Sequence, residues 1–381
     1  CYTGDVANPE RHPKYTLDYY MGLVDELVAT GHLHVLGIKD MAGLLKPQSA
    51  RLLVGSIRAK YPDLPIHVHS HDTAGIAVAS MLTSQPSMGA IVSSLEQMEL
   101  GTGISHDSIQ RLNLYWSEVR QLYQCFEQNV KASDSSVFDH EMPGGQYTNL
   151  MFQSQQLGLG SQWSEIKHAY MEANMLCGDI VKVTPSSKVV GDLAQFMVAN
   201  KLSARDVQEH ASTLDFPVSV VEFFQGFLGT PPGGFPEPLR THIIRNKERV
   251  DTRRGASLPP LDFDKIKSDL TVKYRRPMSE CDAVSWAMYP KVFEEFQAFI
   301  EEFGDLSRMP TRFFLGKPKA GEEMHIPIED GKLLIVKLLG LGPFHEATGM
   351  RDVLFELNSS PRSISVKELS ANVEEVHHEK A

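Results

Sequence analysis

The sequence of 381 residues has few cysteines, no long apolar run and no excess of positive charge. Its four scattered cysteines, Cys1, Cys125, Cys177 and Cys281, show neither zinc-site spacing nor a disulfide framework, which favours a reducing compartment. No apolar run approaches the roughly 18 residues that a membrane-spanning helix needs. The net charge of -11 disfavours nucleic acid, because phosphates are bound by basic surfaces. We therefore expect a globular protein whose partners include neither nucleic acid nor a membrane.

The beginning of the sequence has neither an initiator methionine nor a signal peptide. Cys1 falls near the end of what should be a strand, which gives way to a polar stretch at residues 8–13. We therefore expect a fragment of a larger polypeptide. With 42% apolar residues, the chain is long enough to form the cores of two or three domains.

Three histidines alternate along the segment from Ile66 to Asp72. Alternate residues of an extended strand share one face, so His67, His69 and His71 would point the same way. Imidazole is the commonest metal ligand among protein side chains. We therefore prefer a metal site to the alternative, a polar strand end with solvated histidines.

A short apolar segment, residues 33–38, precedes Lys39 and Asp40 and predicts a buried strand. A helix over 47–61 should connect it to the histidine strand, which makes a βαβ unit. Because parallel strands bring their carboxyl ends to one edge, Lys39 should meet the histidines. A protonated lysine cannot bind a cation, so Lys39 is either salt-bridged or carboxylated to an anionic carbamate. The residues alone favour the salt bridge.

Six motifs occur in the same order as in the pyruvate carboxylase family and closely resemble it. They are Cys1 to Asp5, Lys39 to Pro47, His67 to Asp72, Thr83 to Gly89, Pro143 to Tyr147 and Val183 to Lys188. With the tail described next, the resemblance spans nearly the whole chain.

The resemblance implies an α/β fold: a partial TIM-type (β/α) barrel with a helical extension, followed by a small antiparallel β-rich domain. The barrel part would be residues 1–110, the helical extension or funnel 111–250, and a connecting or allosteric segment 251–310. A β-rich tetramerisation and allosteric domain at 311–367 and a linker at 368–381 toward a biotin carrier domain would follow. Helical spacing of apolar residues beyond Asp107 and alternation from Thr311 agree with this order.

The resemblance also implies the activity of a biotin-dependent pyruvate carboxylase. ATP and bicarbonate would be used at a domain absent from this chain, and biotin would be attached to another absent domain. This chain would hold part of the carboxyltransferase site, which moves a carboxyl group from carboxybiotin to pyruvate and gives oxaloacetate. A homotetramer, acetyl-CoA as allosteric activator, and a location in the cytoplasm or mitochondrial matrix are implied as well.

Residue roles follow from the same resemblance. Carboxylated Lys39, His69 and His71 would bind a divalent metal, either manganese, zinc or magnesium, and His67 would be a supporting or buried residue. Thr184 would be catalytic, as the group that moves a proton between pyruvate and biotin, and Ser187 and Lys188 would contact biotin. This fits the chemistry, since enolising pyruvate requires a proton acceptor and an electrophile near the oxygen.

Two motifs have simpler interpretations that need no family. Thr184 to Ser187 is also typical of a helix start, with threonine or serine capping and proline near the first turn, and this is compatible with catalysis. Paired glycines at Gly144 and Gly145 indicate a turn. In the family this loop borders the active-site funnel, but we expect no direct catalytic role for it.

The chain departs from the family at two places. Further metal and pyruvate ligands, namely an aspartate, an arginine and a glutamine, are expected N-terminal to Cys1 and are absent here. The family also has a strand and loop where Leu82 runs straight into Thr83. Either a segment is absent from the sequence or part of the barrel has been lost.

Other functions remain open. The carboxyltransferase subunit of a transcarboxylase or of oxaloacetate decarboxylase shares the barrel chemistry but should lack the wording of Thr83 to Gly89 and the β-rich tail. A metal hydrolase with a carboxylated lysine would explain Lys39 and the histidines but would give the Thr184 motif no role. A non-catalytic assembly module is the alternative for the isolated fragment.

Overall fold

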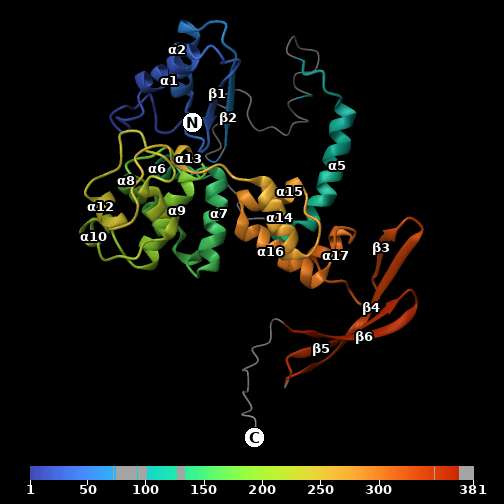
Figure 1. The fold of residues 1–381 in the computed structure, drawn as a ribbon. Helices are drawn as coiled ribbons and strands as arrows, with labels where there is room; N and C mark the ends of the chain where they lie inside the picture. Colours follow the sequence, from blue (N-terminus) through green and yellow to red (C-terminus); the bar gives the residue numbers. More distant parts are fainter. Residues whose placement is uncertain (72, 74–91, 93–100, 127–133, 347, 369–381) are drawn as a thin grey trace. The chain divides into compact units, whose positions relative to one another are not determined.

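The structure is a computed structural model that describes residues 1–71, 73, 92, 101–126, 134–346 and 348–368 (Figure 1). The chain divides into two compact units, each described here by itself. Unit 1 comprises Cys1–Asn113 and Gln128–Leu258, and unit 2 comprises Leu114–Glu127 and Pro259–Ala381. The division into five segments stays a prediction.

Unit 1 begins with a βαβ unit, as the sequence predicted. Helix α1 (Leu17–Ala29) precedes strand β1 (Leu36–Asp40), helix α2 (Pro47–Lys60) and strand β2 (Ile66–Ser70). The strands pair in parallel, with Leu36 opposite Ile66 and Lys39 opposite His69. The helix of the unit packs through Leu53 and Ile57, which are buried in one core with residues of β1. Proline at the first position of α2 suits a helix start because its missing N–H needs no partner there.

The remaining barrel predictions fall on residues that the structure does not describe. The motif Thr83 to Gly89 and the junction of Leu82 with Thr83 lie outside the described residues. The coarser α/β prediction is confirmed by parallel β1 and β2 with their connecting helix.

The second part of unit 1 is a helical layer, which confirms the predicted helical region. Its largest core gathers the helix faces around Leu150, Tyr170, Leu193 and Phe224, all fully buried. The helices are α6 (Val137–His140), α7 (Gly144–Gln156), α8 (Trp163–Leu176), α9 (Ser186–Ala199), α10 (Ala204–His210), α11 (Val218–Gln225), α12 (Leu239–Ile244) and α13 (Arg254–Ser257). Helix α5 (His106–Leu122) contributes residues to both units.

Unit 2 combines short helices with a sheet (Figure 1). The helices α14 (Phe263–Tyr274), α15 (Glu280–Met288) and α16 (Pro290–Phe303) share a small core of Leu270, Met278 and Phe293. Helix α17 (Thr311–Leu315) leads to four antiparallel strands in chain order: β3 (Glu323–Glu329), β4 (Lys332–His345), β5 (Met350–Leu357) and β6 (Ser360–Lys367). The predicted antiparallel sheet is confirmed.

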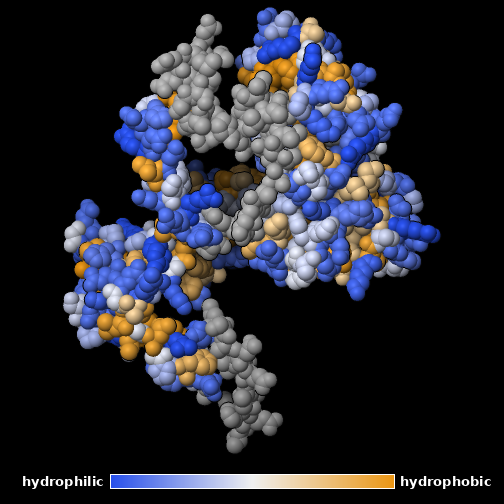
Figure 2. All heavy atoms as spheres, turned by 180° about the vertical axis from the view of Figure 1, so that it is seen from behind, coloured by the Kyte–Doolittle hydropathy of each residue, from blue (hydrophilic) through white to orange (hydrophobic). Residues whose placement is uncertain are grey.

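The sheet of unit 2 exposes apolar side chains. In Figure 2, hydrophobic atoms gather over its strands, and Leu341 on β4 and Ile364 on β6 are half exposed. Every residue of β6 is exposed. Since exposed apolar patches on soluble domains mark interaction sites, this sheet is a candidate for contact with another chain or domain.

None of the described helices is long and apolar enough to cross a membrane.

Candidate active site

The carboxyl ends of β1 and β2 bring together the three predicted metal ligands. Lys39 and His69 are register partners on adjacent parallel strands, so their side chains lie on the same face of the pair. The rings of His69 and His71 are 5.4 Å apart, centroid to centroid. The sequence therefore predicted correctly that Lys39 would lie beside the histidines. The resemblance made His67 a supporting or buried residue; in the structure His67 is exposed, so it is not buried.

Asp40 holds the turn that follows β1. Its buried carboxylate accepts hydrogen bonds from the backbone N–H groups of Leu44, at 2.8 Å, and Leu45, at 3.0 Å. The hydroxyl of Ser70 on β2 donates a third hydrogen bond, at 3.0 Å. Burial raises the pKa of Asp40 despite these bonds. Asp40 thus fixes the ends of both strands, while the neighbouring Lys39 side chain is left exposed.

Two glycines allow the chain to pass close to His71. A Cβ atom on Gly43, which has a φ of +73°, would lie 2.0 Å from the carbonyl oxygen of His71. A Cβ atom on Gly144 would lie 2.5 Å from the Nδ1 atom of the His71 ring. The turn expected at Gly144 and Gly145 is wrong: both are the first residues of helix α7, whose N-cap residue is Pro143, and this helix start packs directly against a predicted metal ligand.

These residues fit a divalent metal by donor chemistry. Desolvation, the charge of His69 and, to a smaller extent, Lys39 lower the pKa of His71, although Asp40 opposes the shift. A lowered pKa keeps the imidazole neutral, which is the form that binds metal. Among the described residues no group of three or more His, Cys, Asp or Glu side chains could hold a metal. A carbamate on Lys39 would supply the third donor beside the two imidazoles.

The second predicted group lies at the start of α9. Thr184 and Lys188 are exposed, and Ser187 is buried. Lys188 pairs with Asp192 one turn along the helix. Among the described residues, no hydrogen bond or ion pair joins these three residues to Lys39, His69 or His71.

The helix start predicted around Thr184 is confirmed, but its expected cap is wrong. Helix α9 begins at Ser186, its N-cap residue is Pro185, and no side-chain hydrogen bond caps it. Proline has no hydroxyl, and the Ser186 hydroxyl instead donates to backbone oxygens such as that of Val181, at 2.6 Å. The Thr184 hydroxyl is thus not engaged as a helix cap.

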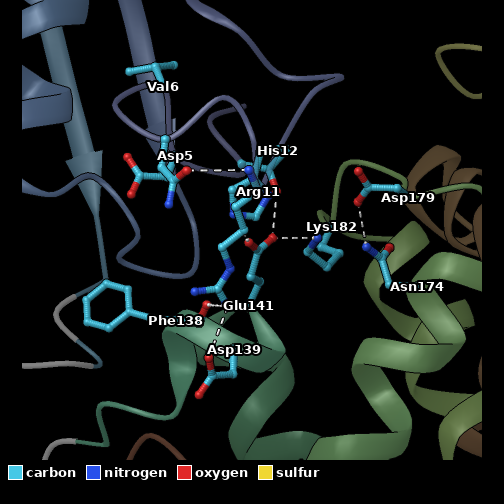
Figure 3. Close-up of polar contacts among 12 residues, drawn as sticks. Asp5, Val6, Arg11, His12, Phe138, Asp139, Glu141, Asn174, Asp179 and Lys182 are labelled. Atoms are coloured by element: carbon cyan, nitrogen blue, oxygen red, sulfur yellow. Dashed lines mark hydrogen bonds and ion pairs between the residues drawn. The ribbon is translucent and has the colours of Figure 1, made fainter.

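A buried charge cluster that the sequence analysis missed connects three of the motifs (Figure 3). The carboxylate of Glu141, which lies between α6 and α7, is 2.9 Å from the Lys182 ammonium and 3.4 Å from the His12 ring nitrogen. The Thr3 hydroxyl donates to the same carboxylate at 3.3 Å. Only 3% of the Lys182 side chain and 10% of the Glu141 side chain are exposed. The only feature of the sequence that pointed to this cluster is the position of Lys182, two residues before Thr184.

Burial and its ionic partners act in opposite directions on Glu141. Burial raises the pKa of the Glu141 carboxyl, but Lys182, His12 and the Thr3 hydroxyl together outweigh burial and hold the pKa below its usual value. The carboxylate is therefore ionised at neutral pH. It ties the amino-terminal motif, the segment before α7 and the segment before Thr184 to one another.

Asp5 forms a second buried junction. Its carboxylate accepts hydrogen bonds from the Lys46 ammonium, at 2.8 Å, and from the Ser49 hydroxyl. Lys46 and Ser49 belong to the turn and helix that follow Lys39. The Cys1 to Asp5 motif therefore anchors the segment that carries Lys39 and Asp40, a role that spacing alone did not indicate.

A family described as conserved carboxylase domain matches residues 137–337, more than half of the chain. The chain therefore belongs to the conserved carboxylase domain family. Its relatives include the pyruvate carboxylase of Aspergillus terreus, which is 53% identical over 401 residues. They also include the mitochondrial pyruvate carboxylase of Mus musculus, which is 47% identical over 402 residues. Both alignments cover 100% of this chain.

The carboxyl transferase domain of Rhizobium etli pyruvate carboxylase has a similar structure, with a TM-score of 0.84 and 40% sequence identity. The similarity covers 97% of this chain and 65% of that one. The resemblance to pyruvate carboxylase stated from the six motifs is thereby confirmed. The chain spans 33% of the Aspergillus terreus protein and 34% of the Mus musculus protein, about a third of each.

Proposed function

We propose that this chain is the carboxyltransferase and assembly part of a biotin-dependent pyruvate carboxylase. Its reaction would be transfer of a carboxyl group from a biotin carrier to pyruvate, which gives oxaloacetate. The observation that carries the proposal is the position of Lys39 opposite His69, beside His71, at the carboxyl ends of parallel strands. One of the similar structures is that of the Rhizobium etli carboxyl transferase domain with pyruvate and biocytin.

The residues of this chain would divide the work as follows. Lys39, carboxylated, would hold a divalent metal (manganese, zinc or magnesium) with His69 and His71. When bound, the metal supplies Lewis acidity at the pyruvate oxygen. The Thr184 hydroxyl would accept a proton from the pyruvate methyl group and deliver it to biotin. Ser187 and Lys188 would contact biotin near the same helix start.

The charge cluster supports this assignment of Thr184. Since Lys182 is held by a buried ion pair with Glu141, the backbone two residues before Thr184 is fixed. The exposed Thr184 side chain is not used as a helix cap. A fixed backbone and an accessible hydroxyl are what a proton-transferring group requires.

The wider assembly belongs to the same proposal. Residues 1–110 would complete a TIM-type barrel with segments before Cys1, and the divisions at 250, 310 and 367 would separate the funnel, the connecting segment, the β-rich domain and the linker. Biotin, ATP and bicarbonate would act at other domains, and acetyl-CoA would activate the enzyme. The exposed apolar residues of the β3 to β6 sheet suit a homotetramer contact. The location would be the cytoplasm or the mitochondrial matrix, and one relative is named mitochondrial.

The test separates the two half-reactions in the full-length protein that bears this chain. Thr184→Ala should lower oxaloacetate formation at least roughly a hundredfold, which is the lower range for loss of a general base. Bicarbonate-dependent ATP cleavage should continue, because it uses another domain. Thr213→Ala, which removes an exposed hydroxyl bonded only to the backbone oxygen of His210 among the described residues, is the matched control and should retain both rates. Retained oxaloacetate formation in Thr184→Ala would refute the proton transfer.

A further inference from the structure

Unit 2 contains a cavity of about 370 Å³ where the end of α14 faces α16. Its lining consists of Lys273, Tyr274, Arg275, Arg276, Gln297, Ile300 and Glu301. Three of these residues are cationic and one is a carboxylate. The charge of this cavity is thus opposite in sign to the net charge of -11 carried by the whole chain.

Gln297 is the buried polar group of this cavity. Only 2% of the residue is exposed, on the face of α16 that also carries the core residue Phe293. Its side-chain oxygen accepts a hydrogen bond from the Arg276 guanidinium at 2.6 Å, which fixes the orientation of the amide. The amide nitrogen of Gln297 has no hydrogen-bond partner among the described residues. A buried donor without an acceptor is destabilising, so an acceptor is expected there.

The two arginines add donors to the same cavity. Arg276 uses one of its N–H groups on Gln297 and has others left. The Arg275 side chain makes no hydrogen bond or ion pair within the described residues, and its backbone is in the left-handed region with a φ of 53°. Lys273 differs, because Glu294 already binds its ammonium at 2.7 Å.

The simpler explanation is that these cations only interact with the carboxyl end of the helix, where backbone carbonyls carry partial negative charge. It accounts for Lys273 and Arg275. It does not account for the buried amide of Gln297, which lies on another helix and presents a donor. Donors from two helices that converge on one cavity require an acceptor with several lone pairs.

We propose that this cavity binds a small oxyanion, a phosphate or carboxylate group, through Arg275, Arg276 and the amide nitrogen of Gln297. The anion would accept charge-assisted hydrogen bonds from both guanidinium groups and satisfy the buried amide. The site stands independently of the proposed carboxyl transfer, because all its residues belong to unit 2.

Hydrogen exchange of backbone amides in the full-length protein tests the site locally, whatever anions bind elsewhere. Inorganic phosphate and acetate are compared separately with chloride at matched ionic strength, which distinguishes a phosphate site from a carboxylate site. Peptides covering 263–303 should exchange roughly tenfold more slowly when the anion is at ten times its dissociation constant, because binding stabilises the folded state by mass action. Chloride, a single spherical ion without the separate acceptor oxygens of an oxyanion, should give no such protection.

Three variants and one control decide the outcome. Arg276→Gln and Gln297→Met should each raise the dissociation constant of the anion at least roughly tenfold, the ratio that corresponds to about 1.4 kcal/mol. Arg275→Gly suits the left-handed backbone, so in chloride it should leave hydrogen exchange unchanged or slower. It should still weaken binding of the anion. Lys291→Gln removes an exposed charge from α16 outside the cavity and should keep the full protection. Protection that is absent with both anions, or that survives in Arg276→Gln and Gln297→Met, would overturn the site.

Discussion

Replacing Lys182 by methionine should leave the buried Glu141 carboxylate without its nearest cation. The two side chains are 2.9 Å apart and almost fully shielded from water. Removal of one partner from a buried ion pair costs about 3–5 kcal/mol. His12, at 3.4 Å, and the Thr3 hydroxyl, at 3.3 Å, still contact the carboxylate, so we expect a loss near the lower end, about 3 kcal/mol.

The pH dependence of this loss has a definite sign. In the wild type the pKa of Glu141 is held below its usual 4.5, so the carboxylate stabilises the fold above about pH 4.5, and this stability is lost as the pH falls through the folded pKa. In Lys182→Met, burial should dominate and raise the pKa of the Glu141 carboxyl. The variant is then destabilised at neutral pH and recovers as acid protonates Glu141. The difference between wild type and variant should therefore be largest near about pH 7 and smaller near about pH 5.

Hydrogen exchange of the amides around α6 and α9 in the full-length protein measures this loss locally. A loss of about 3 kcal/mol should accelerate exchange roughly a hundredfold near neutral pH. The double variant Glu141→Gln with Lys182→Met removes both charges and should recover most of the protection. Lys60→Met breaks a 2.7 Å ion pair with Asp25 on the exposed surface and should leave exchange unchanged. If Lys182→Met behaved like Lys60→Met, the buried cluster would not hold the Thr184 segment, and the reasoning would fail.

Two further predictions concern close packing and burial. Gly144→Ala should displace the His71 ring, because the added Cβ atom would lie 2.5 Å from the Nδ1 atom of the ring. This variant should lower the divalent metal content of the purified full-length protein. Gly145→Ala is the control and should retain the metal, because its Cβ atom would meet nothing within 4 Å. Equal metal content in both variants would count against His71 as a ligand. Burial raises the pKa of the Cys177 thiol to about 12, so alkylation of the native protein should label the exposed Cys281 and spare Cys177, as read by mass spectrometry before and after unfolding. Labelling of Cys177 at the rate of Cys281 would contradict its placement in the core.

The sequence predicted those features that depend on local periodicity and on connection rules. The apolar spacing of residues 47–61 predicted a helix, and the structure has one at Pro47–Lys60. The right-handed connection of parallel strands then placed Lys39 beside His69, because the two strands must end at one edge. Strand β6 lies inside the predicted β-rich domain of residues 311–367, but its residue pattern did not delimit it. Its alternating residues are all exposed, so no buried face marked it as a strand.

Contacts between segments far apart in the chain could not be predicted from local periodicity or connection rules. Glu141 and Lys182 are separated by forty-one positions, and nothing in either local pattern shows that the two charges are buried together. A lone glutamate before a turn is normally a solvated residue, and burial becomes costly only when the fold brings other segments over it. The pairing is thus a property of the tertiary structure, which explains why motif comparison found Thr184 but not the residues that hold its backbone.

The same argument explains why Gly144 and Gly145, which begin helix α7, are not equivalent. Both suit a tight turn, so sequence alone gives them one role. In the structure only Gly144 faces the His71 ring, and a side chain there would occupy the space of the imidazole. Glu141, three residues before the first residue of α7, is fixed by Lys182, which lies two residues before Thr184. The start of α7 is therefore a physical connection between the histidine strand and the Thr184 segment, and a change at either Gly144 or Glu141 should disturb both groups of proposed active-site residues.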